Sequence, residues 1–410
     1  MKRYLLFLLF IIGLLPTLKA QSVDSKSPLA ERDSIKNIQR IDSVKQVDLV
    51  DYLVRIFKIK NSDEKRDNTK VKFSLFPTTS TTSGDKMLVT SFNAAFLLGD
   101  IKNTNISTIY FYPYITFSNQ FGIMLTSNIW LKKNNWNFTG EYFILNYPQY
   151  TWGLGGNSDA ANETLVDFRQ IRFHQNALKG IFPHFAVGLG YSYDRHYNIH
   201  IPEDEVSDKI TQEIPVDTIN TTSSGVVLPV IYDNRNNPIN AKRGIYSSIS
   251  YSFFSTALGS DKAYQTLFLD VRKYFTLPFS KAPVIAFRSY YWTITNGTAP
   301  YLDLPANRWE PADGSSSRGI QKNRYRSNAL LYFESEYRFG ISKNGLWGGV
   351  VFANVLSASE FETQNFQYWH PAGGAGVRMK FNKYSGTNVA LDLGVSKEYF
   401  SVYLLIGEAF

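Results

Sequence analysis

The stretch that decides the fold runs from Asp313 to Phe339 and reads DGSSSRGIQKNRYRSNALLYFESEYRF. Its second half alternates strictly between two sets of side chains, as the geometry of a β-strand requires. A soluble sandwich shows such alternation with its charges in water. A membrane barrel shows it with apolar groups in lipid and charges in a wet lumen. The more polar set is Asn328, Leu330, Tyr332, Glu334, Glu336 and Arg338, and the apolar set is Ala329, Leu331, Phe333, Ser335, Tyr337 and Phe339.

The first twenty residues have the pattern of a secretory signal peptide. Lys2 and Arg3 precede an apolar run from Leu5 to Leu15, and a small residue, Ala20, ends the segment. A short N-terminal anchor helix is the alternative interpretation. The chain contains no Cys, so disulfides, thiolate metal sites and a lipid-modified N-terminal Cys are excluded. We therefore expect an exported protein that folds without covalent cross-links.

Composition favours a barrel over a bundle of membrane helices. No segment after the signal peptide offers eighteen consecutive apolar residues, which a spanning helix needs. The chain nevertheless has 30 Phe, 26 Tyr and 7 Trp, which suits strands with one apolar face and aromatic girdles at both interfaces. The formal net charge is +8, and the basic residues are scattered rather than grouped. We therefore expect no nucleic-acid partner.

Residues 21–70 are polar and read as a periplasmic leader rather than a folded domain. The stretch is too short for a periplasmic domain of ~75 residues with its own core. Within it, Asp48 to Ile59 has the apolar spacing of a short amphipathic helix. This helix has two interpretations: a plug or docking element for the barrel, or a linker segment that packs beneath it.

From Lys72 to the end, one alternating strand follows another, so residues 71–410 are predicted to form an all-β, transmembrane antiparallel barrel. With ~10 residues per strand plus turns, this length fits sixteen strands, and twelve or fourteen with longer loops are the alternatives. Two connections are long, His200 to Thr222 and Thr295 to Ser327. Long loops of such barrels lie on the outer side.

The chain ends KEYFSVYLLIGEAF. Alternation predicts that Phe400, Val402, Leu404, Ile406 and Phe410 share one face of a terminal strand. A last strand that ends in Phe is the usual recognition element for insertion into the bacterial outer membrane. The predicted location is therefore the outer membrane of a Gram-negative bacterium, with outer-membrane lipid as a partner.

Several motifs resemble the BamA/TamA-type barrels of the bacterial surface antigen family. Residues 233–238 (DNRNNP) with 244–246 (GIY) resemble the D-x-R-D-N-P…G-x-Y element of that family. Residues 317–320 (SRGI) resemble its [V/I]-R-G-[F/Y] tip on the sixth outer loop, and 374–378 (GAGVR) its G-x-G-[L/V]-R strand. The ending 406–410 (IGEAF) resembles its G-x-x-aromatic terminus. The resemblance is clear from Val226 to Phe410, and the residues that carry it as motif positions are Asp233, Arg235, Pro238, Gly244, Gly407 and Phe410.

The resemblance implies a sixteen-stranded member without the periplasmic POTRA repeats, with five strands after the loop. It also implies that Arg318 and Gly319 form an inward-folding loop tip that contacts the lumen, with Glu334 and Glu336 as candidate partners. An Arg next to a Gly suits this task, because Gly permits a sharp turn and a guanidinium pairs bidentately with carboxylates. Arg338 and Asn354 complete the predicted contact set. Asn354 stands where the family usually has Asp, which removes one anionic partner from the loop tip.

A catalytic function finds no support in the sequence. His196 and His200 have metal-like spacing, but a solvated pair at a strand end is the simpler interpretation, and we expect no metal or cofactor. The Gly-rich pieces 153–156 and 373–376 lack the Lys-Ser/Thr continuation of a phosphate loop. No G-x-S-x-G elbow is present, so an outer-membrane hydrolase is the weakest of the functions considered.

By resemblance, the expected function is assistance in the assembly, insertion or translocation of outer-membrane proteins. Such a function implies client proteins and a separate periplasmic or membrane partner. A weak seam between the first and last strands would offer one route, because an exposed strand edge can template another strand. The alternative function is a structural or channel-forming barrel without insertase activity.

Overall fold

The computed structural model describes residues 46–49, 51–52, 72–82, 85–100, 103–116, 121–146, 148–202, 220–307, 316–383 and 385–410. At 72–93 and 114–116 only the backbone is described. The predicted signal peptide, nearly all of the leader and most of the His200 to Thr222 connection lie outside these residues. Within them, no helix is long and apolar enough to cross a membrane.

Only the beginning of the predicted amphipathic helix falls within the described residues. Residues 49, 51 and 52 are helical. The Asp48 carboxylate caps this turn by accepting a hydrogen bond of 2.8 Å from the Asp51 main-chain N–H. Val47 donates its N–H to the Asn344 carbonyl at 3.1 Å, and the Lys383 ammonium contacts the Asp51 carboxylate. The segment therefore docks on two turns of the barrel, although its further course stays a prediction.

The rest of the described chain is dominated by β-strands. Short 3-10 turns interrupt the connections at Lys132–Asn134, Ala160–Asn162, Thr256–Leu258 and Tyr301–Asp303. The strands are β1 (Lys72–Thr82), β2 (Asp85–Phe96), β3 (Ser107–Thr116), β4 (Phe121–Trp130), β5 (Trp136–Asn146), β6 (Gln149–Thr151), β7 (Thr164–Phe182), β8 (Phe185–His200), β9 (Thr221–Asp233), β10 (Gly244–Phe254), β11 (Tyr264–Thr276), β12 (Val284–Gly297), β13 (Ala329–Gly340), β14 (Trp347–Ala358), β15 (His370–Lys380), β16 (Asn388–Ser396) and β17 (Phe400–Ile406).

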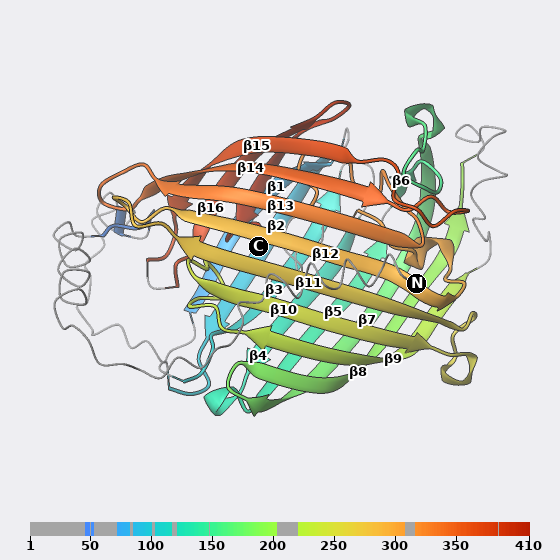
Figure 1. The fold of residues 1–410 in the computed structure, drawn as a ribbon, viewed down its shortest axis with the longest axis horizontal. Coiled ribbons are helices and arrows are strands. Elements are labelled where there is room, and N and C mark those ends of the chain that lie inside the picture. The colour runs from blue at the N-terminus through green and yellow to red at the C-terminus, as the bar shows by residue number, and fades with distance from the viewer. Residues whose placement is uncertain are drawn as a thin grey trace. The chain divides into compact units, whose positions relative to one another are not determined.

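Sixteen of these strands form one antiparallel sheet, because β6 pairs only with the outer part of β7. Each strand of the sheet pairs with the next in sequence, from β1–β2 to β16–β17. The sheet curls round so that β17 lies beside β1 (Figure 1). Five strands follow the long loop, as predicted. The prediction of a sixteen-stranded antiparallel barrel is confirmed.

Alternation along the strands sorts side chains between lipid and lumen. Ile144, Leu189 and Val351 are 61%, 60% and 52% exposed, although they are large apolar side chains in the middle of strands. Such exposure is favourable only against lipid. The inward set mixes charged residues with apolar ones: Tyr290, Ile320, Tyr332 and Leu356 form a buried cluster inside the barrel. The lumen is therefore less uniformly polar than alternation alone predicts.

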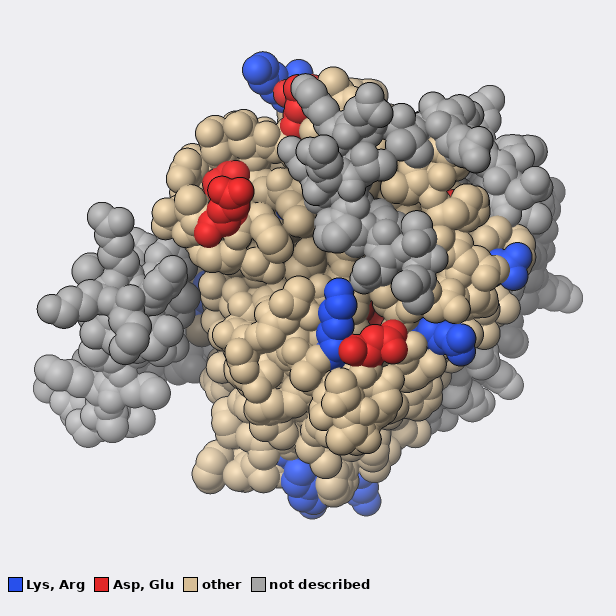
Figure 2. Space-filling view, turned by 90° about the vertical axis from the view of Figure 1, so that its right-hand side faces the viewer, with Lys and Arg blue, Asp and Glu red and all other residues tan. Residues whose placement is uncertain are grey.

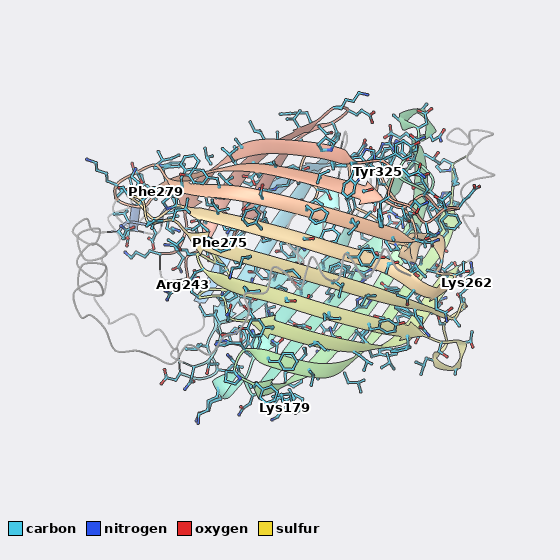
Figure 3. The ribbon with its side chains drawn as sticks, viewed as in Figure 1. Lys179, Arg243, Lys262, Phe275, Phe279 and Tyr325 are labelled. Atoms are coloured by element: carbon cyan, nitrogen blue, oxygen red, sulfur yellow. The ribbon has the colours of Figure 1, made fainter. Side chains whose placement is uncertain are left out.

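The two ends of the barrel differ in their connections. At one end the strands are joined by short turns such as 131–135, 183–184 and 341–346, and at the other by long connections such as 147–163 and 298–328. Long loops lie outside the cell, so we call these the inner and outer ends. Figure 2 looks onto the outer end, where the charged side chains of the described residues are few and scattered. In Figure 3, Arg243 and Phe279 lie at the inner end, and Lys262 and Tyr325 lie at the outer end.

Candidate functional site

The site is built on β13, whose inward face carries two carboxylates and a guanidinium. Glu334, Glu336 and Arg338 are buried at 3%, 2% and 7% exposure, whereas Tyr337 between them is 42% exposed. Ladders with β12 and β14 on both sides fix this register. In that register Glu334 lies opposite Asn354 of β14, so the two side chains point to the same face. Alternation therefore predicts the side of the sheet to which each residue points.

The tip of the loop between β12 and β13 reaches this face from the outer end of the barrel. The backbone is left-handed at Ser317, with φ of 60°, and at Gly319, with φ of 90°. A Cβ atom on Gly319 would lie 2.7 Å from the Val395 nitrogen of β16, so only glycine fits. The Gly319 N–H donates to the Tyr403 hydroxyl at 3.0 Å. Ser317 donates its N–H to the Tyr332 hydroxyl at 2.8 Å.

Arg318 extends from this tip into a fully buried position, with 0% of the residue exposed. Its Nε and Nη2 donate to Glu334 Oε1 at 3.2 and 2.5 Å, and Nη2 also contacts Glu336. Nη1 donates to Asp392 Oδ2 of β16 at 2.5 Å. The guanidinium lies over the Phe352 ring, 3.7 Å from its centroid. Three carboxylates and an aromatic face therefore surround one cation.

Asn354 was predicted only as a lost carboxylate partner of Arg318, but it binds the loop tip itself. Its amide nitrogen donates to the Arg318 carbonyl at 2.9 Å, an interaction that a carboxylate cannot make. The third carboxylate comes instead from Asp392. The structure thus brings Arg318, Glu334, Glu336 and Asn354 together, and it adds a residue that the sequence reasoning left out.

Further contacts join these groups into a closed ring of alternating charges, the charge ring. Arg378 Nη2 donates to Asp392 Oδ2 at 3.2 Å, and Arg378 Nε donates to Glu408 Oε2 at 2.7 Å. Arg338 Nε donates to Glu336 Oε2 at 2.6 Å and lies 4.0 Å from Glu408 Oε2. Arg338 therefore does not touch the loop tip, but links Glu336 to the end of the chain. The members, in order, are Arg318, Glu336, Arg338, Glu408, Arg378 and Asp392.

The end of the chain leaves the sheet, contrary to the prediction that Phe410 shares a face with Phe400. Strand β17 ends at Ile406, and Gly407 turns the backbone with φ of 101°. Phe400 is 62% exposed, whereas Phe410 is 7% exposed and packs against Tyr274 at a ring distance of 6.2 Å. Arg338 Nη2 donates to the Phe410 main-chain oxygen at 2.9 Å. A left-handed turn at glycine therefore overrides the alternation.

The connection between β9 and β10, which contains the Asp233 motif, forms the inner floor of the lumen. Asp233 accepts from Arg235 Nε and Nη2 at 2.9 and 2.7 Å. The Arg235 guanidinium lies 4.5 Å from the centroid of the Tyr246 ring. Gly244 has φ of 110° and no room for a Cβ atom, which would lie 2.6 Å from a main-chain oxygen. Pro238, in the middle of this connection, lines the lumen.

This floor spans the inner end between distant strands. Asn237 donates to the Ser385 carbonyl at 2.8 Å, and Asn240 donates to the Gly386 carbonyl at 3.0 Å. Residues 385 and 386 belong to the turn between β15 and β16. Asn240, in the same connection, also donates to Glu408 Oε1 at 3.4 Å, so the floor contacts the charge ring.

A second set of contacts crosses the outer end. The Thr151 and Tyr301 hydroxyls are 2.5 Å apart, and the Gly155 N–H donates to the Arg326 carbonyl at 2.8 Å. The fully buried Arg326 donates in turn to the Tyr301 carbonyl at 2.8 Å. The connection that carries β6 and the connection that carries Arg318 are thereby locked together over the lumen.

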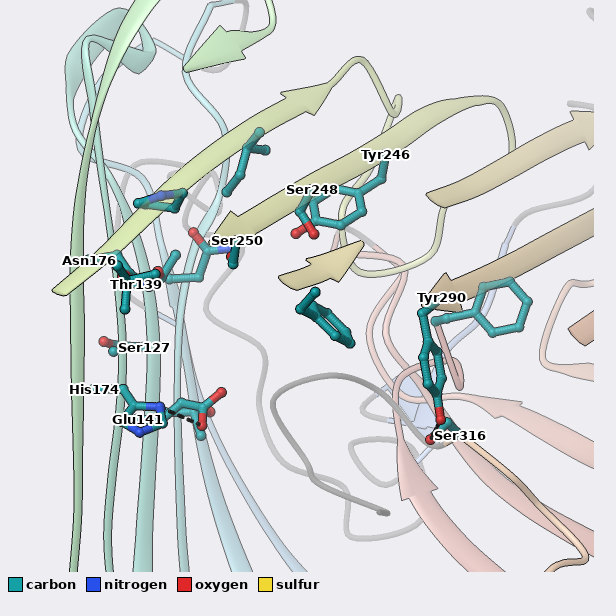
Figure 4. A pocket seen from close by; sticks show the side chains of 18 of the residues that line it. Ser127, Thr139, Glu141, His174, Asn176, Tyr246, Ser248, Ser250, Tyr290 and Ser316 are labelled. Atoms are coloured by element: carbon teal, nitrogen blue, oxygen red, sulfur yellow. Dashed lines mark hydrogen bonds and ion pairs between the residues drawn. The ribbon is translucent and has the colours of Figure 1, made fainter. Parts of the chain in front are cut away.

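Between floor and outer contacts lies a cavity of about 490 Å³. Tyr246, Ser248 and Ser250 of β10 face it from one wall, and Glu141 and His174 from the other (Figure 4). In the second wall, the Arg172 Nε donates to Asp194 at 2.7 Å and His174 Nε2 lies 2.5 Å from the same carboxylate. These groups neutralise one another, and no cluster of the described residues has the arrangement of a metal site.

The histidine pair is placed differently from its prediction as a solvated pair. His196 is buried, at 2% exposure, with its ring edge against Phe168 and its Nδ1 3.7 Å from the Asp303 carboxylate. His200 is exposed and pairs with Asp167 at 3.4 Å. The long β8 strand carries His196 on its inward face beneath the outer loop, which makes burial possible.

Sequence reasoning missed three members of the charge ring. Asp392 and Arg378 are charged residues on the faces of the last strands that lie opposite the apolar rows, which is the same signal that identified Glu334 and Glu336. Glu408 had no such signal, because it lies beyond the turn at Gly407. Glu408 joins the charge ring only because the turn at Gly407 directs the chain back into the lumen.

Comparison with known proteins agrees with this architecture. The family model described as the Omp85 superfamily domain matches residues 91–382. The chain is similar in structure to BamA from Haemophilus ducreyi lacking POTRA domains 1-3, at 13% identity and a TM-score of 0.52, with 95% of this chain and 80% of that chain covered. It is also similar to CdiB from Acinetobacter baumannii, at 12% identity and a TM-score of 0.54, with 83% and 60% covered. No curated protein sequence matches the chain. At these identities the two structural likenesses show a shared fold.

Proposed function

This chain belongs to the Omp85 superfamily, and from that premise we propose that it inserts client β-strand proteins into the outer membrane. It is an outer-membrane β-barrel of a Gram-negative bacterium. Barrels of this superfamily are non-enzymatic transporters or insertases, and clients are outer-membrane or secreted proteins. We propose which of these roles the chain has, namely insertion, and by which route a client protein enters the membrane.

The observation that carries the proposal is the seam between β1 and β17. Every other adjacent pair of strands in the described sheet forms an antiparallel ladder, from β1–β2 to β16–β17. β1 and β17 lie beside each other, but their described residues form no ladder. Unpaired N–H and C=O groups on strand edges template the addition of another strand. A client strand that pairs with such an edge gains main-chain hydrogen bonds in a place where lipid offers none.

Contacts across the lumen favour this lateral route over transport along the barrel axis. At the inner end the β9–β10 connection reaches the β15–β16 turn through Asn237 and Ser385. At the outer end the Thr151 and Tyr301 hydroxyls join two long connections. A polypeptide that passed through the lumen would have to break both sets of contacts. Insertion at the seam requires neither.

Cysteine pairs across the seam test the proposal. The chain has no native Cys, so only the introduced pair can form a disulfide. One cysteine is placed in Lys72–Thr82 and the other in Phe400–Ile406, at several registers, and the levels of outer-membrane proteins are measured in cells that depend on the variant. We expect oxidised seam pairs to lower client levels and a reductant to restore them. The matched control is the pair Leu393→Cys and Val402→Cys, which lie opposite each other on β16 and β17 and should leave client levels unchanged.

The outcomes separate the proposed role from its alternatives. If the oxidised seam leaves client levels unchanged, insertion through the seam is wrong. Unchanged levels together with ion conductance in planar bilayers would identify a channel instead. A separate periplasmic or membrane partner is part of the proposal, and the inner rim, where Asn344 and Lys383 bind Val47 and Asp48, is the surface that we expect it to contact. Co-purification from native membranes identifies that partner.

A further inference from the structure

Two arginines stand out on the outward, lipid-facing surface of the barrel. Arg169 of β7 and Arg195 of β8 are both exposed. Arg169 lies opposite Asn146 on one side and Tyr197 on the other, and Asn146 lies opposite Phe121. Partners in an antiparallel ladder point to the same face, and Phe121 is 55% exposed. The guanidinium of Arg169 is therefore on the outside of the barrel, not in the lumen.

The same ladder places Arg195 on the outside. It lies opposite Ile171, and Ile171 lies opposite Ile144, which is 61% exposed to the surroundings of the barrel. An outward Arg in the middle of the bilayer is strongly destabilising, but near an interface the cost becomes small. The height of both residues therefore decides what they can contact.

Strand geometry sets that height. Lys179, at the inner end of β7, lies opposite Trp136 and has its ammonium 4.9 Å from the indole centroid, as expected at the inner interface. Ten residues of strand separate Lys179 from Arg169. At ~3.3 Å per residue and a tilt of ~40°, they span roughly 25 Å of height, which equals the apolar band of an outer-membrane barrel. Arg169 therefore lies at the outer interface. Arg195 lies about two residues deeper, within reach of that interface by its long side chain.

Neither guanidinium has a carboxylate partner among the described residues. Arg195 lies over the Tyr197 ring at 5.7 Å, and Arg169 forms no ion pair with any carboxylate in the described part of the chain. The acidic residue on the same face of β7, Asp167, is already paired with His200 at 3.4 Å. Two unpaired cations beside a Tyr ring at one membrane interface form a surface that is complementary to an anionic headgroup.

We propose that Arg169 and Arg195 bind the phosphate group of an outer-leaflet glycolipid. A guanidinium presents planar N–H donors that match phosphate oxygens, and it stays charged at any physiological pH. Tyr197, opposite Arg169 on the next strand, provides a hydroxyl beside the phosphate for sugar hydroxyls. The acyl chains of such a lipid would cover the exposed isoleucines below. This binding site is on the outer surface of β7 and β8 and is independent of the seam.

Native mass spectrometry of the purified full chain tests the site. Diphosphorylated lipid A is titrated onto the wild-type protein and onto the Arg169→Gln/Arg195→Gln variant, and the bound fraction is measured. We expect about a tenfold or greater loss of affinity, because each arginine contributes a charge-assisted contact. Enzymatically dephosphorylated lipid A should bind both proteins equally weakly.

The matched control removes two outward cations at the inner interface. In the Lys179→Gln/Lys273→Gln variant, affinity for lipid A should stay at the wild-type value, although the net charge changes equally. Resistance of the folded band to unfolding in unheated detergent confirms that each variant is folded. Equal affinity of wild type and the double Arg variant overturns the proposal. So does competition by millimolar inorganic phosphate, which would show a site for free anions rather than lipid.

Discussion

Replacement of Arg318 by Met is the most direct test of the charge ring and of the loop that it holds. Met keeps much of the volume of the side chain but removes the charge, so Glu334, Glu336 and Asp392 face one another with one cation fewer. All three of these side chains have 0% exposure. Removing one partner from a buried ion pair costs about 3–5 kcal/mol, because the remaining charge is left without compensation. We expect the loop tip to leave the lumen rather than the carboxylates to remain unpaired.

Trypsin reports this release directly. Arg324 and Arg326 follow the tip in the same loop and are 7% and 0% exposed, so the folded wild-type loop should resist cleavage. Where cleavage follows the population of the open form, a loss of about 3–5 kcal/mol corresponds to cleavage that is roughly 10² to 4 × 10³-fold faster. Cleavage within residues 316–327 is followed by mass spectrometry on the purified barrel.

A second substitution separates an electrostatic anchor from a packing defect. Glu334 contacts Arg318 and the Tyr332 hydroxyl, which donates at 2.8 Å. Glu334→Gln should speed cleavage in the wild-type background, because it removes the attraction. In the Arg318→Met background it should slow cleavage, because it removes an uncompensated negative charge. If Arg318→Met leaves the loop resistant, or if Glu334→Gln has the same sign in both backgrounds, the reasoning is refuted.

Three further substitutions probe the backbone and the hydroxyl that support the tip. Gly319→Ala should release the loop, because its Cβ would lie 2.7 Å from a main-chain nitrogen of β16. Gly407→Ala, at φ of 101° but with no atom within 4 Å of the added Cβ, should cost about 1–3 kcal/mol of backbone strain without a clash, and should release the loop less than Gly319→Ala does. Tyr332→Phe should accelerate cleavage by about 30-fold, because Ser317 N–H and Glu334 each lose a buried partner worth about 1 kcal/mol, about 2 kcal/mol together. Equal effects of the two glycine substitutions, or a neutral Tyr332→Phe, would contradict these contacts.

Alternation and length were sufficient to predict the barrel. The strict period of two in β13 and its neighbours assigns lipid and lumen faces, and about 340 residues at ~10 per strand plus turns lead to sixteen strands. The resemblance around Arg318 indicated an inward loop, and the inward faces of β13 supplied two of its three carboxylates. These features depend on local spacing, which a single sequence records.

Other features depend on backbone direction and on contacts between distant segments. In the sequence, Phe410 continues the apolar alternation of β17. In the structure, the left-handed turn at Gly407 directs Phe410 into the lumen. Glu408 joins the charge ring for the same reason. From the sequence, Asn354 is only the loss of a carboxylate. In the structure its amide donates a hydrogen bond to the Arg318 carbonyl, whose position no sequence pattern predicts. His196 reads as a surface residue until the outer loop carrying Asp303 is placed above it.

The charge ring also sets an order of events. Its six members come from the loop tip, β13, β15, β16 and the residues after β17, and Arg318 and Asp392 are separated by 74 positions in the sequence. Two of its anions, Asp392 and Glu408, belong to the last 20 residues. Unpaired buried charges are costly. The loop tip can therefore bind stably inside the barrel only after the final hairpin has formed. Trypsin resistance of the loop should therefore appear last in a refolding time course. The ring makes burial of the loop conditional on completion of the barrel wall.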